Sequence, residues 1–278
     1  MTSTQAVSRV KRICGARKAG HAGTLDPLAT GVLPVAFGEA TKTVPFVQNG
    51  EKIYRFKIRW GIETCTDDSE GTVAAQSSAR PSADDILLLL PRFTGTIQQL
   101  PPAFSAVKIN GARAYDIARG GETPVLTPRT VTFHALDLIQ TGRDEAEFEA
   151  RCGKGTYIRA LARDLGRALG CYGHVTALRR TRAGPFYEQH LVSLEELDTD
   201  ASGYRAIRPV EAGLSELTRI TVDSGAAAKL RRGQPLLLRG QDIPADGVAY
   251  AACGGAVIAV GTIEKGELVP GRVFNLPI

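Results

Sequence analysis

The sequence predicts an α+β protein with a small β-rich domain of barrel type at its C-terminal end. Segment 51–61 alternates polar and apolar residues as a strand does, whereas 2–13 and 158–169 place apolar residues three and four positions apart, as helices do. From about residue 218 onward, short apolar runs alternate with glycine turns, which is typical of a small barrel. The chain has 278 residues, 43% of them hydrophobic, which is enough to bury a core.

The first predicted helix carries its own start signal. Thr2 and Gln5 have the spacing of a capping box, in which each side chain bonds the other residue's backbone N–H. Ala6, Val10 and Ile13 then recur at three-to-four spacing and are expected to form its buried face.

A glycine-rich loop follows, and we expect it to lead into a strand at 31–38. The next strand is the alternating segment 51–61, and a polar loop is expected at 63–73. The apolar face of the alternating strand consists of Tyr54, Phe56, Ile58 and Trp60.

A capped helix is expected from Ser82 to the residue before Pro91, because proline cannot continue a helix. Segment 98–125 is mixed, with a turn signal at Asn110–Gly111, and predicts a protruding lobe or a hairpin with a helix. Segment 145–170 reads as a strand, a Gly-Lys-Gly turn and a helix with a leucine-rich face.

The apolar pattern loosens after residue 201, and we place a domain boundary between Val210 and Leu217. The expected domains are therefore 1–210 and 211–278. The second contains the closely spaced short strands of the predicted barrel.

Positive charge is unevenly distributed along the chain. Lys and Arg total 34 against 29 Asp and Glu, a net charge of +5, and the cations concentrate in 8–18 and 159–182. Such clusters favour a polyanionic partner such as nucleic acid, although charge alone is equally compatible with a solvated surface.

The five cysteines are scattered and form no C-x-x-C pair, which argues against zinc and favours a reducing compartment. No apolar run approaches the length that spans a bilayer, and the N-terminus lacks the apolar stretch of a signal peptide. The expected location is the cytoplasm, with no membrane association.

Asp26 is the most singular acidic residue, since it lies in a long glycine-rich segment with few other acids. An Asp-Pro pair is usually a turn device, because the carboxylate bonds nearby backbone N–H groups. The same carboxylate is also a candidate nucleophile or general base. A buried carboxylate needs a positive partner, and Arg159, at the start of a predicted helix, is the candidate.

Four further stretches, in order, accompany this loop. The loop reads GHAGTLDPLATGVLPVAFGEATK, and the four further stretches are YRFKIRWGIET, LPPAFSAVKINGARAYDIAR, GKGTYIRALARDLGRALG and LRRTRAGPF. Together they resemble the TruB family of tRNA pseudouridine(55) synthases over nearly the whole of the first two hundred residues. The C-terminal segment resembles the PUA-like RNA-binding domain that often accompanies the family, with weaker motifs.

The resemblance implies a pseudouridine synthase fold, a mixed and largely antiparallel sheet with flanking helices and a mobile insertion. It implies that the protein, an isomerase, converts uridine 55 in the T loop of tRNA to pseudouridine. Asp26 corresponds to the catalytic aspartate, Tyr54 to the tyrosine packed against the target base, and Arg159 to the arginine paired with the aspartate. His21 corresponds to the histidine that helps hold the flipped-out loop.

Two departures from the family pattern are visible. Family members usually begin with a strand and a K-P-x-G turn before a T-S pair, and here Met1 directly precedes Thr2 and Ser3. Cys65 also stands where an aspartate is common.

Substrate and product of this reaction are isomers, so no cofactor and no metal are expected. Asp26 attacks either the ribose carbon or the base, and the sequence leaves both routes open. Tyr54 can stack on the base and accept or relay its C5 proton, while Arg159 would orient Asp26 and favour its charged form.

The uridine must be extruded from the folded T loop, at a cost of a few kcal/mol that phosphate contacts and stacking must offset. The candidate phosphate contacts are Lys18, Lys108, Arg113, Arg119, Lys154, Arg179 and Arg180. The expected partner is tRNA alone, bound by a monomer.

Two other functions are compatible with parts of the pattern. A tRNA-folding chaperone without catalysis would share the basic segments. A hydrolase of glycosidic bonds would need a second carboxylate, for which Asp67, Asp68 and Asp164 are available.

Overall fold

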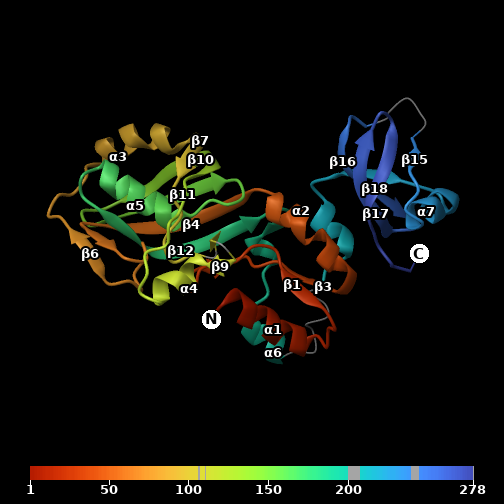
Figure 1. The fold of residues 1–278 in the computed structure, drawn as a ribbon, viewed down its shortest axis with the longest axis horizontal. Coiled ribbons are helices and arrows are strands. Elements are labelled where there is room, and N and C mark those ends of the chain that lie inside the picture. The colour runs from red at the N-terminus through yellow and green to blue at the C-terminus, as the bar shows by residue number, and fades with distance from the viewer. Residues whose placement is uncertain (106, 110, 200–206, 239–243, 278) are drawn as a thin grey trace. The chain divides into compact units, whose positions relative to one another are not determined.

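A computed structural model of the chain describes residues 1–105, 107–109, 111–199, 207–238 and 244–277 (Figure 1). The chain divides into two compact units. One comprises Met1–Leu25, Leu33–Gly50 and Ala183–Ile278, and the other comprises Asp26–Val32 and Glu51–Arg182. Each unit is described below by itself, and the domain boundary near residue 210 stays a prediction.

The unit that contains Asp26 is built on one main sheet. Within it the strands follow the order β12–β4–β11–β10–β7, and the short β2 pairs with β12 in parallel. The pairs β4–β11, β11–β10 and β10–β7 are antiparallel. These strands are β2 (Thr30–Gly31), β4 (Lys52–Trp60), β7 (Gly95–Gln99), β10 (Arg129–Thr141), β11 (Glu145–Cys152) and β12 (Gly173–Ala183).

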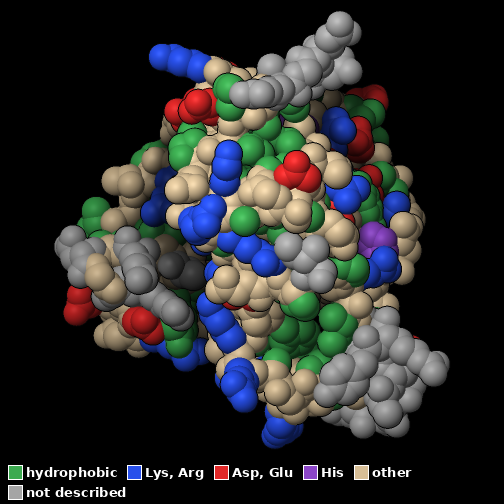
Figure 2. All heavy atoms as spheres, turned by 90° about the vertical axis from the view of Figure 1, so that its right-hand side faces the viewer, with side chains coloured by type: hydrophobic (Ala, Val, Ile, Leu, Met, Phe, Trp, Pro, Cys, Tyr) green, Lys and Arg blue, Asp and Glu red, His purple; other side chains and the backbone are tan. Residues whose placement is uncertain are grey.

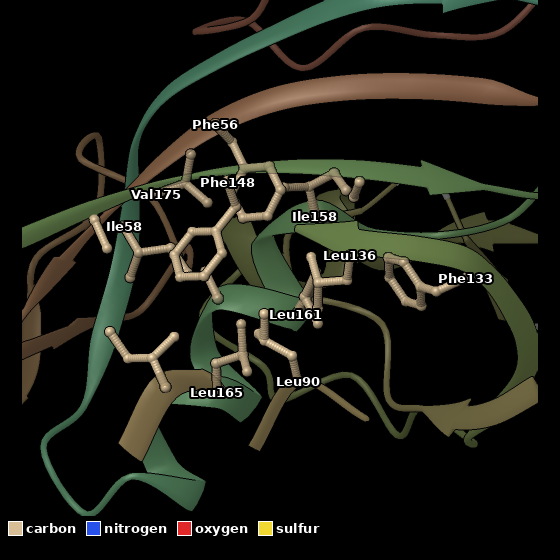
Figure 3. Packing of buried hydrophobic residues seen from close by; sticks show 14 of the residues in the cluster. Phe56, Ile58, Leu90, Phe133, Leu136, Phe148, Ile158, Leu161, Leu165 and Val175 are labelled. Atoms are coloured by element: carbon tan, nitrogen blue, oxygen red, sulfur yellow. The ribbon is translucent and has the colours of Figure 1, made fainter. Parts of the chain in front are cut away.

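Two helices, α3 (Ala83–Leu89) and α5 (Ile158–Ala168), contribute to the core of this sheet. The predicted alternation in β4 is confirmed, because Phe56, Ile58 and Trp60 are buried and Tyr54 packs against the same cluster. Figure 3 shows Phe56 and Phe148 among these residues, and their rings stack at 5.5 Å between centroids. Ile158, Leu161 and Leu165 of α5 complete the cluster, so the core fixes the helix that carries Arg159.

Shorter elements surround this core. Strands β5 (Ile62–Thr64) and β6 (Val73–Gln76) pair at the ends of the segment predicted as a polar loop. The mixed segment forms the hairpin of β8 (Lys108–Ile109) and β9 (Ala112–Arg113), followed by α4 (Ala114–Arg119), as one of its two expected forms. The turn predicted there includes Asn110, which lies outside the described residues.

The second unit begins with α1 (Ser3–Ile13), and its capping box between Thr2 and Gln5 is confirmed. Val10 of the expected face is buried, together with Ser3 and Val7, whereas the expected Ala6 and Ile13 are only partly buried. Further elements are β1 (Ala19–His21), β3 (Val35–Phe37), η1 (Gly38–Thr43) and α2 (Val44–Asn49), then β13 (Phe186–Tyr187), η3 (Glu188–His190) and α6 (Leu194–Thr199).

The same unit contains a sheet of five strands in the order β14–β16–β17–β18–β15, with α7 (Ser224–Arg231) packed on its core. The strands are β14 (Thr218–Thr221), β15 (Leu236–Leu237), β16 (Gly247–Cys253), β17 (Ala256–Glu264) and β18 (Glu267–Val273), preceded by η5 (Val210–Leu214). The expected β-rich C-terminal segment is thus confirmed.

The prediction of one strand at 31–38 is wrong. Gly31 ends β2 with a φ of 96°, and Pro34, which has no N–H to donate, precedes β3. The chain therefore changes partner between the two: β2 pairs with β12, and β3 pairs with β1.

Candidate active site

Asp26 lies in the coil between β1 and β2, and local contacts hold that coil. The residue before it, Leu25, donates its N–H to the buried hydroxyl of Ser3 at 2.8 Å, and its carbonyl accepts from that hydroxyl at 3.2 Å. The Asp26 carbonyl accepts the N–H of Ala29 at 2.9 Å, closing a turn around Pro27. The backbone on both sides of the carboxylate is therefore fixed.

The carboxylate of Asp26 forms a two-point ion pair with Arg159. The Nε and Nη2 atoms of Arg159 donate to Oδ2 and Oδ1 at 2.9 and 2.8 Å. The Asp26 side chain is 29% exposed and that of Arg159 only 5%. The two bonds from the arginine thus fix the plane of the carboxylate. The exposed part of the Asp26 side chain stays accessible to a substrate.

Arg159 reaches two more segments of the same unit. Its Nη1 donates to the carbonyl of Thr66 at 2.9 Å and lies 3.5 Å from the buried carboxylate of Asp68. Its Nη2 also donates to the carbonyl of Phe104 at 3.0 Å. Burial lowers the pKa of Arg159, but the charge and hydrogen bonds of Asp26 and the charge of Asp68 outweigh it, and the net pKa is raised. The guanidinium therefore stays charged.

Tyr54 lies on β4 at the edge of the hydrophobic core and is partly buried. Burial raises the pKa of its hydroxyl, while the charge of Arg180 lowers it and that of Asp26 raises it slightly. The charge of Asp26 therefore acts on the Tyr54 hydroxyl, and the role of Tyr54 as the residue packed against the target base stays a prediction.

A family model described as "TruB family pseudouridylate synthase (N terminal domain)" matches residues 11–158, which is more than half of the chain. The chain belongs to the TruB family. A second model, "tRNA pseudouridylate synthase B C-terminal domain", matches residues 159–220.

Whole-length relatives agree with this assignment. A tRNA pseudouridine synthase B from Rhodopseudomonas palustris is 56% identical over 99% of this chain and 78% of its own length. The enzyme of the same name from Bradyrhizobium diazoefficiens is 54% identical over 99% of this chain and 83% of its own. A crystal structure of a Cbf5–Nop10–Gar1 complex matches with a TM-score of 0.74 at 26% identity, covering 98% of this chain and 80% of that one.

This TruB-family chain places the predicted phosphate contacts in different settings. Lys18, Arg119, Lys154 and Arg179 are exposed. The guanidinium carbon of Arg119 lies 4.8 Å from the centroid of the Tyr115 ring, and Arg179 donates to the hydroxyl of Thr30 at 3.4 Å.

The other predicted contacts lie elsewhere. His21 ends β1 in the other unit and is partly buried. The backbones of Lys108 and Arg113 pair across β8 and β9, while their side chains lie outside the described part.

Arg180 requires a correction. Its side chain is 1% exposed, and its Nε donates to the carbonyl of Val32 at 2.8 Å inside the sheet. A guanidinium in this position cannot contact a phosphate at the surface. The strand alternation explains the difference, because neighbouring residues point to opposite faces, so Arg179 faces outward and Arg180 inward.

Sequence reasoning missed the role of two groups at the site. Asp68 appeared only as a carboxylate for a rival hydrolase, and here it faces Arg159 and is further held by the hydroxyl of Thr66 and the N–H of Glu70. Tyr157, two residues before Arg159, lies near Asp26, whose charge adds to the burial that raises its pKa.

Across the described residues, no group of three or more His, Cys, Asp or Glu side chains is arranged to hold a metal ion. In the same part of the chain, no helix is both long and apolar enough to cross a membrane.

Proposed function

We propose that this protein is a tRNA pseudouridine synthase that isomerises uridine 55 in the T loop of tRNA to pseudouridine. The observation that carries the proposal is the two-point Asp26–Arg159 pair in a chain of the TruB family. The named activity of the R. palustris relative, over nearly the whole chain, supports the same substrate.

The reaction breaks the bond between ribose C1′ and uracil N1 and forms a bond between C1′ and C5. The hydrogen on C5 leaves as a proton, and N1 gains a proton, so the product has the composition of the substrate. The carboxylate of Asp26 serves as the nucleophile, toward ribose C1′ or base C6, and its open edge gives it access.

The other site residues prepare this step. Arg159 compensates the charge of Asp26 and fixes its plane, which restricts the attack direction. Tyr54 stacks on the extruded uracil and receives or relays the C5 proton. The reaction requires that the detached base stay beside the ribose while it rotates.

We also propose that the enzyme binds tRNA as a monomer in the cytoplasm, without an obligatory protein partner. The exposed cations Lys18, Arg119, Lys154 and Arg179 are its proposed phosphate contacts, together with Lys108 and Arg113 of the β8–β9 hairpin and with His21 at the flipped loop. On the face that Figure 2 draws, Lys and Arg side chains lie among hydrophobic, neutral and a few acidic ones. Contact with a polyanion requires exposed cations. Size-exclusion chromatography of the free protein and of its tRNA complex tests whether the protein is a monomer.

A T-stem-loop RNA with tritium at uridine C5 tests the activity directly, since forming the new C–C bond expels that hydrogen. The wild type should release tritium, whereas Asp26→Asn should release none above background and still bind the RNA. The matched control is Asp144→Asn, which removes an exposed carboxylate paired with Arg80 and should keep activity within twofold.

Two other outcomes of this assay would contradict the proposal. Binding without tritium release by the wild type would instead identify a tRNA chaperone. Substantial release by a pure Asp26→Asn preparation would return Asp26 to a turn-shaping role.

A further inference from the structure

A second buried arginine lies one helical turn after Arg159. Residues four apart on a helix share a face, so Arg159 and Arg163 of α5 point to the same side. The side chain of Arg163 is 7% exposed, close to the 5% of Arg159. The catalytic ion pair therefore has a neighbour of the same chemistry, which the reaction described above does not use.

The guanidinium of Arg163 donates hydrogen bonds to three partners. Its Nη1 donates to the carboxylate of Asp67 at 3.0 Å, and its Nε donates to Asp164 at 2.9 Å. Its Nη2 donates to the carbonyl of Leu100 at 2.8 Å. Only a planar group with several N–H donors in fixed directions can serve all three at once.

The two arginines hold the same two segments. Arg159 donates to the carbonyl of Phe104, and Arg163 donates to that of Leu100. The two arginines therefore bind the two ends of the stretch 100–104. This stretch, LPPAF, contains two prolines without N–H groups and leads into the β8–β9 hairpin. Its fixed position therefore depends on donors from outside, and α5 supplies them.

The second shared segment is 66–68. Arg159 bonds the carbonyl of Thr66 and faces Asp68, while Arg163 pairs with Asp67 between them. Asp67 is 5% exposed and has a φ of 61°, in the left-handed region that Asp adopts more readily than most residues other than glycine. The Asp67–Arg163 pair is the contact that holds the side chain of this residue.

We propose that Arg163 and Asp67 form a positioning pair for the isomerisation, which aligns the segments around Arg159 and thereby the plane of the Asp26 carboxylate. The pair acts through Arg159 and touches no substrate. The proposal rests on the proposed function, because its effect is read in the rate of that reaction.

Arg163→Lys tests the pair, because an ammonium keeps the charge but cannot bond three partners in one plane. We expect the single-turnover rate of tritium release at saturating enzyme to fall at least tenfold, while the Kd for the RNA changes less than threefold. The matched control is Arg167→Lys, one further turn along α5, whose two bonds go to Glu63. It should stay within twofold of the wild type.

A double-mutant cycle separates positioning from general stability. Because Arg163 acts through Arg159, Arg163→Lys should lower the rate less than threefold in a background that already carries Arg159→Lys. A full tenfold loss in that background, or a rate within twofold of wild type for the single variant, would overturn the proposal.

The fraction of folded protein is measured by circular dichroism before each assay. Should Arg163→Lys fail to fold, Asp67→Asn replaces it, since the amide preserves the shape of the side chain. The same tenfold loss supports the pair, and a rate within twofold overturns it. Absence of release by the wild type itself would refute the proposed function and not this pair alone.

Discussion

At the residue scale, the chemistry depends on how one carboxylate is held. Asp26 is supported by the backbone of its own turn and by the two N–H groups on one edge of the Arg159 guanidinium. Arg159 in turn is held by the carbonyls of Thr66 and Phe104. The orientation of the proposed nucleophile therefore depends on four separate chain segments.

Arg159→Lys should lower kcat although it conserves the charge, because an ammonium cannot make the two parallel bonds that Asp26 receives. We expect a loss of at least tenfold in kcat, about 1.4 kcal/mol or more of transition-state free energy, with the RNA still bound. Tritium release at saturating RNA measures it. Activity within twofold of the wild type would remove Arg159 from the site.

Asp67 makes stability depend on pH. Burial raises the pKa of its carboxyl to about 6; Arg163 and Arg159 lower it, and Glu63 and Asp164 raise it further. Because the folded state then binds more protons than the unfolded state between about pH 4 and 6, this group favours folding as the pH falls through 6.

The free energy of unfolding of the wild type, relative to that of Asp67→Asn, should thus rise by up to about 3 kcal/mol from pH 7.5 to pH 4. Urea titrations of both proteins across this range measure the difference. A flat difference would show that the pKa of Asp67 keeps its ordinary value, and a difference that falls toward acid would show that the arginines lower it.

At the element scale, the two-residue strand β2 positions the catalytic loop. A Cβ on Gly31 would lie 2.2 Å from the carbonyl oxygen of Arg180, and the φ of Gly31 is +96°. Replacing Gly31 thus combines strain in the backbone with a clash across the β2–β12 pair.

Gly31→Ala should lower stability by about 1–3 kcal/mol and the tritium-release rate at least tenfold, because it displaces the segment that follows Asp26. The control is Gly95→Ala, with a φ of +89° and open space at its Cβ position, which isolates the strain. Thermal melting and single-turnover assays are compared. Equal effects of both variants on rate would refute a role for the close β2–β12 approach.

At the scale of the whole molecule, the excess of positive charge should govern RNA affinity. Log affinity should fall linearly with log salt, by about 0.7 per phosphate contact in single-stranded and 0.9 in duplex RNA. Arg179→Ala should flatten this slope by about one contact, since this side chain is exposed, whereas the buried Arg180 is no longer part of the prediction.

The control is Arg143→Ala, which removes the same charge from the exposed turn between β10 and β11. Filter binding at several salt concentrations gives both slopes. If the two variants flatten the slope equally, net charge and not contact by Arg179 accounts for it.

The sequence by itself determined the elements whose residues repeat at a regular period, such as β4 and α5, and the capping box of α1. It also identified the family, and motifs of fixed local spacing led to the prediction of Asp26, Tyr54 and Arg159 as site residues. Periodicity, helix caps and turns depend on residues that are close in the sequence, so they can be predicted from the sequence alone.

Only the tertiary structure decided which groups meet. Asp26 and Arg159 are separated by 133 positions and Asp67 and Arg163 by 96, so no local pattern encodes their distances. The change of partner between β2 and β3, and the inward face of Arg180, likewise depend on which strand lies alongside. Burial and ion pairing arise where distant segments pack together, and this packing pairs the carboxylate of an Asp-Pro turn with a buried arginine.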